Sequence, residues 1–212
     1  MLRSTRRRLG VAAVTALLLA ATLSPGTSHA RAERVVLSSD ASGSRLARES
    51  LDLCLGSKLD RGLELAEKAV AETPNDAKAH FAVFCNLGRQ LETRGADLAS
   101  VSDVGRLKEE IDRALEIEPA FIDALIAKGR FLDQLPWIMG GDDDESEQLL
   151  RKAVSLAPDY AQARVFLAEF LLEHDETEEA RRLAIEASIL AKASGERELL
   201  ARARTVADEA RG

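Results

Sequence analysis

The chain has 212 residues, a formal net charge of −7 and only 4% aromatic residues. An acidic chain without a stripe of lysine and arginine repels phosphate groups, so its composition excludes nucleic acid as a partner.

Residues 1–30 have the pattern of a secretory signal. Four arginines precede an apolar run over residues 11–23, and the small-residue sequence Ser28-His29-Ala30 follows. The run is shorter than the roughly 20 residues that a membrane-spanning helix needs. We expect cleavage near Ala30, a periplasmic or secreted location, and no stable membrane insertion afterwards. The Arg6-Arg7 pair leaves both general secretory and twin-arginine export open.

After cleavage, 182 residues would remain, and their net charge would be −11 because the signal carries four arginines and no acid. Residues 31–44 are rich in serine and glycine near Ser38–Ser44, which predicts a flexible linker. Residues 45–212 are long enough for one helical domain with a continuous core. Their apolar spacing predicts helices over 45–56, 60–72, 77–93, 101–118, 121–134, 145–156, 160–174, 178–193 and 196–211.

A short phrase recurs three times in this domain. A basic residue, an alanine and an aliphatic residue are followed by a proline, as in Lys68-Ala69-Val70 with Pro74. The other copies are Arg113-Ala114-Leu115 with Pro119 and Lys152-Ala153-Val154 with Pro158. The alanine permits close helix contact, the proline ends the helix, and Asn or Asp residues just after Pro74 and Pro158 favour a new helix start. The phrase therefore predicts stacked helical hairpins.

These residues resemble the tetratricopeptide repeat family, whose units are helical hairpins of about 34 residues. The best match is the unit with Leu167, Ala168 and Leu171 in its first helix and Ala180, Ala184 and Ala187 in its second. The resemblance implies an all-α fold, a right-handed superhelical stack of about four hairpins with a C-terminal capping helix. Uneven proline spacing places extra residues in the second and third units, around Gly95–Ser102 and Leu135–Asp142.

The segment from Gly129 to Asp142 also resembles helical-repeat proteins related to the T component of tripartite ATP-independent periplasmic (TRAP) transporters. That resemblance implies an exported protein that associates with a solute-binding protein or a small amphipathic ligand.

Two features of the segment from Leu135 to Glu147 allow more than one interpretation. Trp137 either anchors its own hairpin or, with Ile138 and Met139, lines a partner surface. The acidic run Asp142–Glu147 lacks the spacing of a calcium loop and is interpreted as a helix cap.

Cys54 and Cys85 are 31 residues apart, close to one repeat length. In an exported chain they are candidates for a disulfide, with two isolated buried thiols as the alternative.

The family resemblance implies a concave face lined by the first helices of the hairpins. It would carry aliphatic and aromatic residues together with two arginines, a surface suited to an extended peptide or to an amphipathic ligand that carries a carboxylate. An alternative is that several of these residues pack against the C-terminal helix. The candidate partner-binding residues are Leu51, Phe81, Arg89, Ile126, Arg130, Gln134, Trp137, Val165, Glu169 and Leu172.

His80 and His174 stand alone in separate predicted helices, without metal-ligand spacing or a neighbouring nucleophile. We therefore predict no catalytic, cofactor or metal site. The expected function is an exported scaffold that binds a protein or peptide of the cell envelope.

Overall fold

The computed structural model describes residues 44–94 and 101–211, without the side chain of Val101. The predicted signal, its cleavage position, the linker up to residue 43 and residues 95–100 of the extra segment around Gly95–Ser102 lie outside the described residues. Every regular element within them is helical. The helices are α1 (Arg45–Cys54), α2 (Leu59–Glu72), α3 (Ala77–Arg94), α4 (Val101–Ile117), α5 (Ile122–Gln134), η2 (Trp137–Met139), α6 (Asp143–Leu156), α7 (Ala161–Glu173), α8 (Thr177–Ser194) and α9 (Arg197–Glu209).

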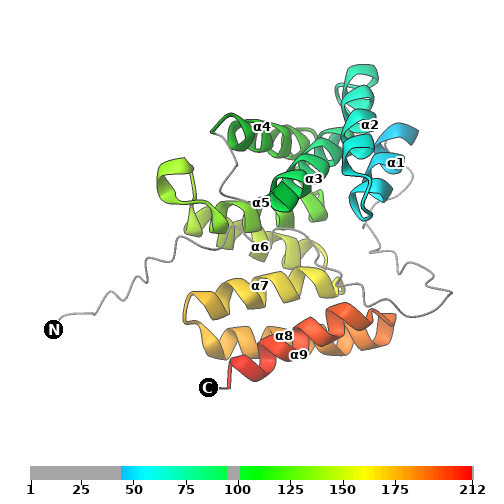
Figure 1. Cartoon of the computed structure of the whole chain (residues 1–212). Helices are drawn as coiled ribbons and strands as arrows, with labels where there is room; N and C mark the ends of the chain where they lie inside the picture. Colours follow the sequence, from blue (N-terminus) through cyan, green and yellow to red (C-terminus); the bar gives the residue numbers. More distant parts are fainter. Residues whose placement is uncertain (1–43, 95–100, 212) are drawn as a thin grey trace.

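Consecutive helices pair as hairpins: α1 with α2, α3 with α4, α5 with α6, and α7 with α8 (Figure 1). The last helix, α9, packs against both α8 and α7. The predicted all-α stack of four hairpins with a C-terminal capping helix is thereby confirmed. Among the described helices, none is long and apolar enough to cross a membrane.

Helices α1 and α6 begin at side chains that accept hydrogen bonds from free backbone N–H groups. Ser44 Oγ accepts from Ala47 N at 3.0 Å at the start of α1. At the start of α6, Asp142 Oδ1 accepts from Glu145 N at 2.9 Å. The prediction that the acidic run caps a helix is therefore confirmed.

The alanine of each repeated phrase brings two helices into close contact. Ala69, Ala114 and Ala153 are fully buried, on α2, α4 and α6. A larger side chain at these places would separate the helices of the stack, because interiors are packed to crystal-like density. The repeated phrase thus predicts both the helix ends and the contacts between helices.

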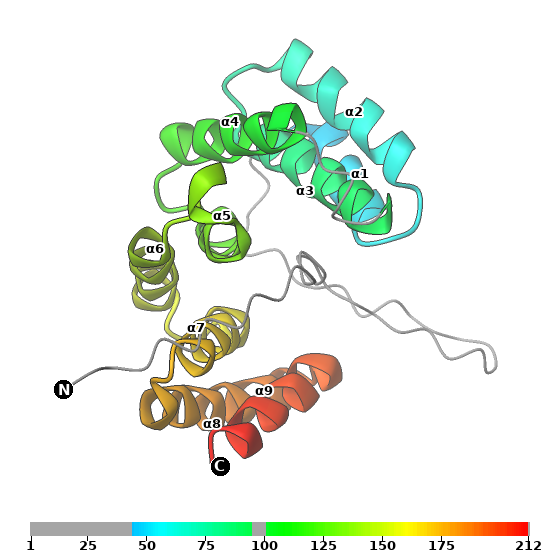
Figure 2. The same cartoon turned by 60° about the vertical axis from the view of Figure 1, so that its left-hand side comes forward.

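The stack curves, with α5 and α7 on its inner side and α6 on its outer side (Figure 2). Two core clusters run along it. Phe131 and Ala124 of α5 belong to the cluster shared with α1–α4, whereas Leu125 and Ile126 belong to the cluster shared with α6–α9. Helix α5 is therefore the element through which the two halves of the core join.

Cys54 and Cys85 lie side by side and form a disulfide between α1 and α3. Their Cα atoms are 6.1 Å apart, within the range that a disulfide spans. The packing of α1 against α3 brings the two positions together.

Candidate functional site

Four of the residues assigned to the concave face are core residues. Leu51, Phe81, Ile126 and Val165 have at most 5% of their surface exposed. The reason is that the inner helices contact neighbours on several sides: α3, for example, packs against α1, α2 and α4. Their apolar side chains therefore fill the interior and are not available to a partner.

The C-terminal helix covers part of the inner face at α7. Val165 clusters with Ala203 of α9, and Glu169 pairs with Arg202, whose Nη2 lies 2.6 Å from Glu169 Oε2. The alternative interpretation, in which concave-face residues pack against the C-terminal helix, therefore describes these two residues. Leu172 is half-buried against the core cluster of α5–α9.

Two arginines lie over one aromatic ring on this face. The guanidinium carbons of Arg130 and Arg202 are 4.2 Å and 4.5 Å from the centroid of the Phe166 ring. Burial lowers the pKa of Arg130 to about 10, and the positive charge of Arg202 adds to this effect. Sequence reasoning identified Arg130 but missed Arg202 and Phe166, because their meeting depends on how α9 docks.

The other two polar candidates are also partly inside the fold. The Arg89 guanidinium donates to the backbone oxygen of Cys54, so it links α3 to the end of α1. Gln134, in the last turn of α5, has a buried side-chain oxygen without a hydrogen-bond partner in the described part of the chain. A partner that reaches this face would meet an Arg89 guanidinium that is already hydrogen-bonded within the fold.

The turn between α5 and α6 presents its apolar residues to solvent. Trp137 is 78% exposed and Ile138 is 71% exposed, whereas Met139 packs against the core. The interpretation of Trp137 as an anchor of its own hairpin is wrong in this structure. The turn is held by Gly140, which has a left-handed backbone with φ of 91°, and by Gly141, where a Cβ would lie 1.9 Å from Leu135 O. The backbone folds back tightly and leaves the indole outside.

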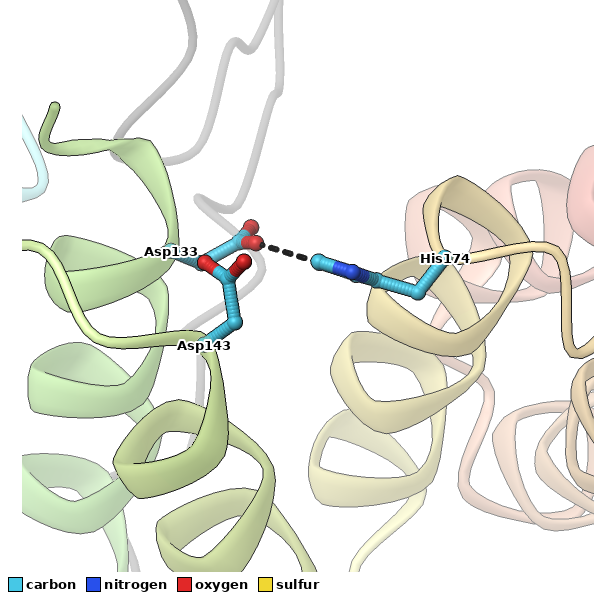
Figure 3. A group of neighbouring side chains, drawn as sticks. All are labelled: Asp133, Asp143 and His174. Atoms are coloured by element: carbon cyan, nitrogen blue, oxygen red, sulfur yellow. Dashed lines mark hydrogen bonds and ion pairs between the residues drawn. The ribbon is translucent and has the colours of Figure 1, made fainter. Parts of the chain in front are cut away.

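One group of side chains near this turn can hold a metal ion. Asp133 of α5, Asp143 at the start of α6 and His174 after α7 each offer a ligand atom, and these atoms lie within 4.8 Å of one another (Figure 3). The prediction that His174 stands alone is wrong, because the structure places it beside Asp133 and Asp143. The three residues are far apart in the sequence, so no local spacing could have revealed the group.

The second histidine is part of a structural contact. His80 Nδ1 lies 2.7 Å from Glu110 Oε2, and its Nε2 lies 3.0 Å from Pro74 O. The ring therefore connects α3, α4 and the turn that precedes α3.

The described helices form a stack of helical hairpins that is similar to a stack of tetratricopeptide repeats. Residues 140–204, which cover α6, α7, α8 and part of α9, match the family model described as tetratricopeptide repeat. Repeats of this family commonly mediate binding to other proteins or peptides and are in general not catalytic. No curated protein matches the chain.

Proposed function

We propose that this protein is an exported scaffold that binds another protein, and that the α5–α6 turn is part of its contact surface. The observation that carries the proposal is the exposure of Trp137 together with Ile138. Large aromatic and aliphatic side chains seldom remain so exposed side by side, and tryptophan is enriched among the residues that dominate binding energy.

The export part of the proposal rests on two features. Residues 1–30 carry the arginines, apolar run and small-residue end of a secretory signal. The disulfide between Cys54 and Cys85 suits an oxidising compartment such as the bacterial periplasm. Both features agree with a location in the cell envelope or outside the cell.

The turn, and not the inner face, is the better candidate for the first contact. Turn residues need no rearrangement, whereas Arg130 and Glu169 already take part in contacts within the stack. The resemblance of this same turn to TRAP T components supports a finer proposal, in which the partner is a solute-binding protein of a transport assembly. A small amphipathic ligand is the alternative within that proposal.

The test is a quantitative pull-down from envelope extract with wild type, a Trp137→Ala/Ile138→Ala double variant and an Ile189→Ala control. Ile189 is also a large exposed apolar residue, at 64% exposure, but it lies on α8. We expect a partner that binds wild type and the control equally and loses roughly thirtyfold in affinity with the double variant.

Two results would contradict the proposal. Equal capture by the double variant would exclude the turn as the contact surface. Absence of any saturable partner for wild type would exclude the scaffold function itself. A co-purifying small molecule in a native mass spectrum would favour the ligand alternative.

A further inference from the structure

We propose that Asp133, Asp143 and His174 form a binding site for a divalent transition-metal ion, which joins the α5–α6 hairpin to the α7–α8 hairpin. The inference is independent of the proposed partner-binding surface. It rests on three side chains from separate elements that point toward one another (Figure 3).

The distances suit a single ion. His174 Nε2 lies 3.0 Å from Asp133 Oδ1, and all three ligand atoms lie within 4.8 Å of one another. Ligand nitrogen and oxygen atoms bind zinc at roughly 2.0–2.2 Å, so two neighbouring ligands of one tetrahedral ion are separated by about 3.4 Å. The Asp133–His174 pair is slightly closer than this and would open by a few tenths of an ångström, and Asp143 completes the set by a small rotation of its exposed side chain.

The backbone holds the two carboxylates on the same side of the hairpin. Asp142 N donates to Leu132 O at 3.3 Å, so the residue before Asp143 is tied to the last turn of α5. Gly141 packs directly on Leu135 O, where a Cβ has no room. The turn therefore returns the chain to α5 and places Asp143 beside Asp133.

The imidazole is held by a separate contact. The His174 ring stacks on Phe170, with centroids 4.2 Å apart and an angle of 27° between the planes. This stacking restricts the ring while one edge faces the carboxylates. A ligand whose orientation is fixed before binding loses less conformational entropy when the ion arrives.

The Asp133–His174 contact alone would also be explained as an ion pair between hairpins. Asp143 distinguishes the two explanations. Its carboxylate makes no hydrogen bond or ion pair among the contacts of the described residues, yet it lies against the pair. Two carboxylates therefore face one imidazole. Local negative charge in excess favours a cation.

The donor set indicates the class of ion. Calcium and magnesium prefer sites made of oxygen ligands alone, whereas an imidazole nitrogen suits zinc and its neighbours in the first transition row. Three protein ligands leave at least one coordination position for water or for a group from another molecule. Zn²⁺ is therefore the probe of choice.

The experiment is titration calorimetry of Zn²⁺ into the tag-free full chain, after removal of metals with EDTA. The variants are His174→Ala and Asp143→Asn, and the matched control is Asp144→Asn. Asp143 and Asp144 both lie in the first turn of α6, so the two asparagine variants make the same charge change at the same helix end. Circular dichroism in EDTA checks that each variant is folded.

We expect one Zn²⁺ per chain for wild type and for Asp144→Asn, and a loss of about tenfold or more in affinity for His174→Ala and Asp143→Asn. Mg²⁺ should not compete at equal concentration. The proposal is overturned if wild type does not bind, if Asp143→Asn and Asp144→Asn bind equally, or if Mg²⁺ displaces Zn²⁺. Should His174→Ala fail to fold, the Asp143→Asn comparison still decides, because that side chain supports no other contact.

Discussion

Gly62 of α2 lies directly against Asn86 of α3: a Cβ atom on Gly62 would be 1.9 Å from Asn86 Oδ1. The Asn86 amide nitrogen donates to Ser50 Oγ at 3.0 Å and to Ala82 O at 2.9 Å. Ser50 Oγ in turn donates to the backbone oxygen of Gly62 at 2.7 Å. A buried polar network thus joins α1, α2 and α3, and it requires the absence of a side chain at position 62.

The first prediction concerns this close approach. Gly62→Ala should lower the free energy of unfolding by about 1–3 kcal/mol, because the added methyl group must displace the buried amide. Gly105→Ala is the control, since Gly105 is also helical but has no atom within 4 Å of its Cβ position. There alanine should raise the free energy of unfolding by up to about 1 kcal/mol through helix propensity. Urea unfolding followed by circular dichroism measures both, and equal effects would contradict the close contact.

The second prediction concerns the Cys54–Cys85 bridge. The two residues are 31 positions apart, so the bridge restricts the unfolded chain and should contribute about 3–4 kcal/mol to stability. A Cys54→Ser/Cys85→Ser variant should unfold at clearly lower urea than the oxidised wild type. Reduced wild type should behave like the variant. Alkylation of two thiols in protein that was never reduced would show that the bridge does not form.

The third prediction is a pH dependence at Glu179. Arg151 of α6 donates to both carboxylate oxygens of Glu179 of α8, at 2.9 Å and 3.0 Å. The hydrogen bond with Arg151 lowers the pKa of Glu179 below its ordinary value, against the opposing effect of burial. A carboxyl group with a lowered pKa in the folded state stabilises the protein above its unfolded pKa, and this contribution is lost as the pH falls through the folded pKa.

Accordingly, Glu179→Gln should lower the free energy of unfolding by about 0.5–1 kcal/mol at pH 7. The difference from wild type should vanish in acid, once the wild-type carboxyl is protonated. Glu178→Gln is the control, because Glu178 lies in the same first turn of α8 and is exposed. A Glu179 effect that is equal at pH 7 and in acid would exclude the ion pair as its cause.

The fourth prediction concerns Tyr160, the single tyrosine of the chain. Its hydroxyl donates to Asp123 Oδ1 at 3.0 Å. Burial, followed by the charge of Asp123, raises the pKa of Tyr160 far above its ordinary value. In the unfolded chain the phenol ionises above a pH of about 10, so the folded state loses stability as the pH rises through that value.

Tyr160→Phe should cost about 1.5 kcal/mol at pH 7, through loss of a hydrogen bond to a charged acceptor. It should also remove this part of the alkaline loss of stability, which comparative urea unfolding at pH 7 and above pH 10 would measure. Tyrosinate absorbance gives a direct readout, since no other tyrosine contributes. Ionisation of wild-type tyrosine at its ordinary pH in the folded protein would contradict the buried contact.

The helices could be predicted closely because their signals are local. The prolines after Ala69, Ala114 and Ala153 mark helix ends, and the predicted bounds agree with the structure to within two residues. Which side chains of the inner face are exposed could not be predicted in the same way. The resemblance placed Ile126 and Val165 on the concave face, yet they are buried, because burial depends on how closely neighbouring helices and α9 pack.

Local signals are enough to predict the hairpin stack, since hydrophobic period, small residues and proline stops act within a few residues of one another. Uneven proline spacing also indicated two distinctive segments, around Gly95–Ser102 and Leu135–Asp142. Only the tertiary structure decided that Trp137 is exposed on that turn and that His174 meets Asp133 and Asp143. These relationships join residues that are distant in the chain, and they arise from the packing of one hairpin on the next.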